Sequence, residues 1–77
     1  MERLSTMMPG EKVRVVKLDT QGTLKKKIMD MGITKGTVIQ IVKFAPLGDP
    51  MEILVRGYNL SIRKQDAQGI IVERVEM

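Results

Sequence analysis

Glycines and prolines recur along the whole chain and divide it into short segments. Seven glycines and three prolines are distributed over 77 residues, and no cluster of them marks a linker. Because these residues end helices and strands, they predict short elements joined by turns. A parallel sheet needs crossover connections of about a dozen residues, for which there is no room. The spacing therefore favours antiparallel strands within one small domain that covers residues 1–77.

Five segments have the composition of β-strands. They are rich in β-branched residues or alternate apolar and polar side chains, and turn-forming residues bound them. We predict strands over Lys12–Leu18, Thr37–Phe44, Met51–Arg56, Tyr58–Arg63 and Ile70–Val75. The alternation slips at Val15 and Val16, which indicates a bulge or bend in the first strand. Gly57 leaves room only for a tight hairpin turn between the third and fourth strands.

One segment has helical periodicity. Leu24, Ile28 and Met31 recur at positions i, i+4 and i+7 with lysines between them, which places the apolar side chains on one face. We therefore predict a single helix over Thr20–Met31.

The two ends of this helix carry their own signals. Thr20 or Thr23 can cap its start, because a hydroxyl oxygen accepts a hydrogen bond from a free backbone N–H. Gly32 follows the helix where a left-handed backbone is preferred, and Ile33 is placed for the hydrophobic contact of a Schellman turn.

Five short strands with one short helix after the first strand are the ingredients of a small closed β-barrel. We therefore expect a mainly β fold with five strands. The residues expected to point inward are Val13, Val15, Ile39, Ile41, Met51, Ile53, Val55, Leu60, Ile62, Ile70 and Val72. The helical residues Leu24, Ile28 and Met31 are expected to plug one open end.

Two missing residue types narrow the chemistry of the chain. There is no histidine and no cysteine, so no imidazole base, thiolate nucleophile or Cys-rich metal site is available. The carboxylates lack the dense spacing of a calcium loop. We therefore expect no enzymatic activity, no cofactor and no resident metal ion.

The chain is mildly basic, with a net charge of +4. That excess favours acidic surfaces and leaves a small nucleic-acid-binding barrel as an alternative function. Tyr58 and Phe44 are the aromatic residues of the chain, and so few rings weaken this alternative because single strands stack on aromatics. No uncharged stretch approaches a membrane span, and the N-terminus lacks the apolar core of an export signal. We therefore expect a cytoplasmic protein.

The exposed flank of the predicted helix is the first candidate for a binding surface. On a helical wheel Met29 falls between Lys25 and Lys26, away from the apolar face. Two cations around an apolar side chain suit an acidic protein partner or a phosphate backbone. The alternative is an ordinary solvated helix face.

The loop over residues 46–50 is the second candidate. Pro46 and Pro50 fix their own φ angles, and Asp49 is held extended by the proline that follows it. Leu47 would lie exposed at the tip of this rigid loop and could enter a pocket of a partner. We therefore predict a partner surface comprising Lys25, Lys26, Met29, Leu47 and Asp49. A plain structural loop is the alternative for the last two.

Five motifs follow one another over nearly the whole chain. They are Leu4-x-x-Met7-x-Pro9-Gly10, a basic helix leading into Met31-Gly32-Ile33-x-x-Gly36-Thr37, then Pro46-Leu47-Gly48-Asp49-Pro50, Gly57-x-x-Leu60-Ser61-Ile62-Arg63 and Ala67-x-x-Ile70-x-Val72. In this order they resemble the bacterial ferrous iron transport protein A (FeoA) family. The sequence departs from that pattern mildly, with Ile28 in place of leucine and Ser61 in place of alanine.

The resemblance implies an SH3-like barrel and a small cytoplasmic accessory or regulatory protein of ferrous iron uptake. Its implied partner is the FeoB membrane GTPase permease, contacted at the cytoplasmic domain. Since the chain has no histidine or cysteine, it is better suited to regulate or assemble that transporter than to carry Fe²⁺. Similar domains occur at the C-terminus of metal-dependent repressors, and a free-standing relative of such a domain is a further alternative.

Overall fold

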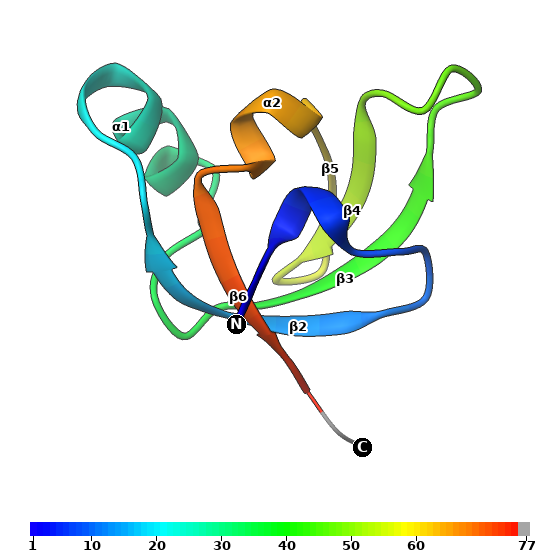
Figure 1. Ribbon diagram of the computed structural model, residues 1–77, viewed down its shortest axis with the longest axis horizontal. Coiled ribbons are helices and arrows are strands. Elements are labelled where there is room, and N and C mark those ends of the chain that lie inside the picture. Colours follow the sequence, from blue (N-terminus) through cyan, green and yellow to red (C-terminus); the bar gives the residue numbers. More distant parts are fainter. Residues whose placement is uncertain (76–77) are drawn as a thin grey trace.

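The computed structural model describes residues 1–75 and consists of one curved antiparallel sheet with helical segments beside it (Figure 1). The strands are β1 (Glu2–Arg3), β2 (Lys12–Leu18), β3 (Val38–Phe44), β4 (Met51–Val55), β5 (Tyr58–Ile62) and β6 (Ile70–Arg74). The helices are the short 3₁₀ helix η1 (Leu4–Thr6), α1 (Gly22–Asp30) and α2 (Lys64–Ala67). The fold is therefore mainly β, as predicted.

The sheet is open, so the prediction of a closed five-stranded barrel is wrong. Within residues 1–75 the sheet has six strands in the order β1-β6-β2-β3-β4-β5, and the outer strands β1 and β5 are not paired with each other. Helical segments fill the space where a closing strand pair would lie, since α2 packs against η1. Leu4 and Met7, in and after η1, have no exposed surface. These two buried side chains complete the core at the place where a closed barrel would have covered it with paired strands.

The elements that sequence patterns missed are all short. β1 has two residues and pairs with β6, and α2 has four residues. Neither is long enough to display a strand or helix period. The prediction of a single helix is therefore wrong, whereas the five longer strands lie where they were predicted to within one residue at each end.

The core contains the inward set that alternation predicts, with one exception. Fully or nearly fully buried are Val13, Val15, Ile39, Ile41, Met51, Ile53, Val55, Ile62, Ile70 and Val72, together with Ile28 of α1. Leu60 is only partly buried, because it lies on the edge strand β5. Leu24 and Met31 are also partly buried against this core.

The end of α1 has the predicted Schellman geometry. Gly32 has a φ of +89°, and its N–H donates to the carbonyl of Met29 at 2.9 Å. The Ile33 N–H donates to the carbonyl of Ile28 at 3.3 Å. The start of the helix differs from the prediction, because the N-cap residue is Gln21 and its side chain makes no capping bond.

The hairpin between β4 and β5 is tied to the end of α1. Arg56 and Gly57 have φ angles of +51° and +86°, the left-handed pair that a two-residue type I′ turn requires. The Arg56 side chain reaches across, where Nε donates to the carbonyl of Gly32 at 3.2 Å and Nη2 donates to Thr37 Oγ1 at 3.4 Å. The predicted bulge in the first strand is also present, between Val15 and Lys17.

Candidate interaction surface

The outer flank of α1 is exposed as predicted. Ile28 turns into the core, whereas Lys25 and Lys26 are exposed and 46% of the Met29 surface remains open to solvent. An apolar side chain left half open between lysines costs hydrophobic free energy that a partner could recover.

The structure divides these three residues between two depressions. Lys25 and Met29 are i, i+4 neighbours and line the same depression. Lys26 lines another, which it shares with Asp30 one turn later. The predicted helix patch therefore has a purely basic side and a side of mixed charge.

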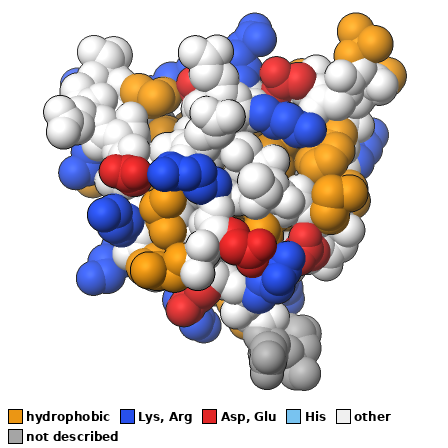
Figure 2. All heavy atoms as spheres, in the orientation of Figure 1, with side chains coloured by type: hydrophobic (Ala, Val, Ile, Leu, Met, Phe, Trp, Pro, Cys, Tyr) orange, Lys and Arg blue, Asp and Glu red, His pale blue; other side chains and the backbone are white. Residues whose placement is uncertain are grey.

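The loop that joins β3 to β4 places its two predicted residues in different roles. Leu47 is 97% exposed, and Figure 2 shows hydrophobic side chains gathered over this loop at the upper right. Asp49 instead faces α2, where its Oδ1 accepts a hydrogen bond from the Lys64 N–H at 3.0 Å. The Lys64 Nζ lies 4.3 Å from the centre of the Phe44 ring. The first contact holds the loop against α2, and the second holds the end of β3 against it.

The predicted surface consists of two separate regions. In Figure 1 α1 lies at the upper left and the β3–β4 loop at the upper right, with α2 between them. The structure therefore brings Lys25 and Met29 together, and Leu47 and Asp49 together, without joining the two pairs. A partner protein with one compact binding surface can contact one of these regions, or both if it also covers α2.

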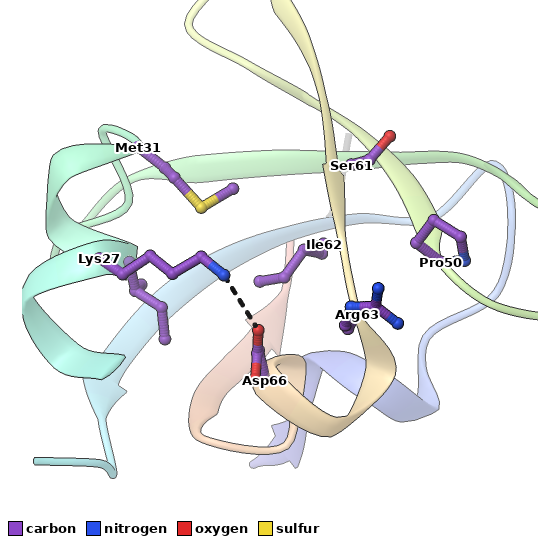
Figure 3. Close-up of a pocket in the computed structure, with 8 residues that line it drawn as sticks. Lys27, Met31, Pro50, Ser61, Ile62, Arg63 and Asp66 are labelled. Atoms are coloured by element: carbon purple, nitrogen blue, oxygen red, sulfur yellow. Dashed lines mark ion pairs between the residues drawn. The ribbon is translucent and has the colours of Figure 1, made fainter. Parts of the chain in front are cut away.

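A groove lies between α1 and the β5–α2 segment, and sequence patterns did not predict it. It encloses about 250 Å³ and is lined by Lys27, Ile28, Met31, Pro50, Ser61, Ile62, Arg63 and Asp66 (Figure 3). Lys27 reaches toward α2, with its Nζ 3.7 Å from Asp66 Oδ2. Within residues 1–75 the Arg63 side chain has no ion-pair partner. α2 forms one wall of this groove. The groove could have been predicted from the sequence only if α2 had been recognised there.

A network of short hydrogen bonds and ion pairs lies elsewhere, where β6 meets the segment before β2. Glu11 Oε1 accepts the Met8 N–H at 2.6 Å, and Glu11 Oε2 accepts Arg74 Nε at 2.6 Å. The hydrogen bonds from Met8 and Arg74 lower the pKa of Glu11. The hydrogen bond with Glu11 and the negative charge of Glu11 raise the pKa of Arg74, and the negative charge of Glu2 raises it further by a smaller amount. This network joins β6 to the segment before β2 and is structural.

Two further features of the described residues bear on function. Residues 1–75 contain no group of three or more acidic side chains arranged to hold a metal ion. No helix in the same part of the chain is long and apolar enough to cross a membrane.

A family model, the FeoA domain, matches residues 2–74. The chain belongs to the FeoA family. The match covers every strand and helix of the fold, so the family resemblance seen in the five sequence motifs is confirmed.

Members of the FeoA family resemble this chain in sequence and in structure. The Fe(2+) transport protein A/Fe(2+) transporter FeoB fusion protein of Porphyromonas gingivalis is 37% identical over 73 residues, which cover 95% of this chain and 9% of the fusion protein. The NMR structure of a FeoA-like protein from Clostridium acetobutylicum has 41% identity and a TM-score of 0.92, and the match covers 99% of this chain and 88% of that one.

A second FeoA structure gives the name of the fold. The Stenotrophomonas maltophilia FeoA complexed with zinc is described as a prokaryotic SH3 domain protein, and it matches with a TM-score of 0.73 over 95% of this chain and 91% of that one. At 22% identity this likeness shows the fold alone. The open sheet of this chain is therefore SH3-like.

Proposed function

We propose that this chain is a cytoplasmic accessory protein of bacterial ferrous iron uptake that acts as a protein-interaction module for the FeoB GTPase permease. The observation that carries the proposal is the Porphyromonas gingivalis relative, in which the matching region belongs to one chain with FeoB. Joining two modules in one chain raises their effective concentration to about millimolar for a short linker, which favours pairs that work in contact.

The chemistry of the chain supports a binding role over catalysis. Without histidine or cysteine, the usual general bases and thiolate nucleophiles are missing. Its surface offers features typical of protein contacts instead, namely the half-exposed Met29 beside Lys25 and the fully exposed Leu47 on a braced loop. Exposed apolar side chains held on ordered elements bind at a low entropic cost.

The decisive experiment is a calorimetric titration of this chain into the isolated cytoplasmic domain of FeoB from the same organism. We expect saturable binding, with GTP hydrolysis by that domain measured in parallel to establish that it is folded and active. Saturable binding with either a rise, a fall or no change in hydrolysis supports the interaction module and identifies the kind of regulation. An active FeoB domain that releases no binding heat and gives no shift in size-exclusion chromatography would overturn the proposal.

A further inference from the structure

Three lysines from three parts of the chain meet around one depression, which we call the three-lysine depression. Lys17 comes from β2, Lys25 from α1 and Lys35 from the turn before β3. The depression measures about 290 Å³, and its remaining lining consists of Leu18, Met29 and Thr34. Figure 2 shows basic side chains along the left side of the molecule, beside and below α1. No carboxylate is among the described residues that line the depression.

These three cations lack the carboxylate partner that two other lysines of the chain have. Lys27 and Lys43 each have a carboxylate within ion-pairing distance, at 3.7 Å and 3.6 Å. Among residues 1–75, Lys17, Lys25 and Lys35 have no such partner. Like charges brought together by a fold repel one another and oppose compaction unless countercharge is supplied. The missing countercharge points to a ligand that carries negative groups.

The rest of the lining defines the kind of anion. Leu18 and Met29 give the depression an apolar part, which a bare phosphate would leave unused. No arginine is among the described residues that line the depression, so it offers three separate point charges instead of the planar fork that holds a phosphate or a carboxylate with two parallel hydrogen bonds. Lysines around an apolar centre suit carboxylates on either side of an apolar side chain, because each ammonium group can follow a flexible acidic residue.

We infer that the three-lysine depression binds an acidic segment of the FeoB cytoplasmic domain that carries an apolar side chain. The inference rests on the proposed function and names the part of the surface that makes the contact. It extends the predicted helix patch to Lys17 and Lys35, which come from other elements, and it assigns Lys26 to the neighbouring depression.

The test compares two double variants of equal charge. Lys17→Gln with Lys35→Gln removes two cations from the depression and leaves Lys25 in place. The matched control, Arg14→Gln with Lys43→Gln, also removes two cations, and both of these side chains lie in exposed ion pairs outside the depression. We expect the first variant to weaken binding to the FeoB domain about tenfold and to flatten its salt dependence, whereas the control stays within about threefold of the wild type.

Each outcome has one meaning. If the wild type binds and both double variants bind equally well, the inference is overturned while the proposed function stands. If the wild type does not bind an active FeoB domain, the proposed function is overturned, and the inference is overturned with it. If the first variant keeps its affinity for the FeoB domain but loses binding to vesicles of phosphatidylglycerol, the depression is a lipid site and the inference is overturned. Melting temperatures of both variants near the wild-type value establish that they are folded.

Discussion

At the scale of single residues, Glu11 makes the stability of this chain dependent on pH. Its hydrogen bonds with Met8 and Arg74 lower its pKa below the ordinary value of 4.5. A carboxyl group with a lowered pKa in the folded state binds fewer protons there than in the unfolded chain. Its stabilising contribution is therefore complete above the ordinary carboxyl pKa and is lost as the pH falls through the lowered value.

We predict that Glu11→Gln lowers the melting temperature near neutral pH. Between neutral and acidic pH the variant should then lose less melting temperature than the wild type does. The measurement is a series of thermal unfolding curves from about pH 7 to about pH 3, a range that spans the ordinary carboxyl pKa. Glu73→Gln is the matched control, because Glu73 lies in an exposed ion pair with Arg14. Parallel pH profiles for Glu11→Gln and the wild type would contradict the prediction.

Asp49 illustrates how one side chain can serve structure where the sequence predicted a partner contact. Its carboxylate accepts the N–H of Lys64, the first residue of α2, and so satisfies one of the free N–H groups at the start of a helix, as a capping side chain does. We predict that Asp49→Ala lowers the free energy of unfolding by about 1 kcal/mol, whereas Asp49→Asn retains most of it. Urea unfolding measures both, and equal midpoints for Asp49→Ala and the wild type would exclude the capping role.

At the scale of elements, α1 is attached to the sheet through its apolar face. Ile28 is buried in the core, and the helix is too short to be stable in water without that packing. We predict that Ile28→Asp costs at least about 3 kcal/mol, because an unpaired carboxylate would be buried. Met29→Asp, one residue away on the exposed flank, should change stability by less than about 0.5 kcal/mol. Chemical denaturation distinguishes them, and an unchanged midpoint for Ile28→Asp would mean that α1 does not depend on this face.

At the scale of the whole molecule, the two candidate contact regions are separated by α2 (Figure 1). We predict that Lys25→Glu with Lys26→Glu, and separately Leu47→Asp, weaken association with the FeoB cytoplasmic domain and lower ferrous iron uptake. The melting temperatures should stay near the wild-type value, because these side chains are exposed. Calorimetry and uptake assays test each variant. If both bind and support uptake normally, the contact lies on other surfaces, such as the outer faces of the strands around Glu52 and Arg63.

The sequence by itself determined the features that depend on local periodicity. The strand Lys12–Leu18 and its bulge follow from alternation and its slip at Val15 and Val16, and the end of α1 follows from Gly32. These signals are local, because side-chain direction repeats every two residues in a strand and about every 3.6 in a helix. Neighbouring residues therefore contain the information.

Tertiary structure decided what depends on contacts between distant segments. β1 and α2 are too short to show a period and exist because β6 and η1 lie beside them. Leu4 and Met7 complete the core from the N-terminus, which leaves the sheet open where a closed barrel was expected. In the same way Lys17 and Lys35 lie far from each other in sequence and meet only because β2 and the turn after α1 fold against each other. Chain entropy opposes such long-range contacts, and only the packing of the whole core overcomes it.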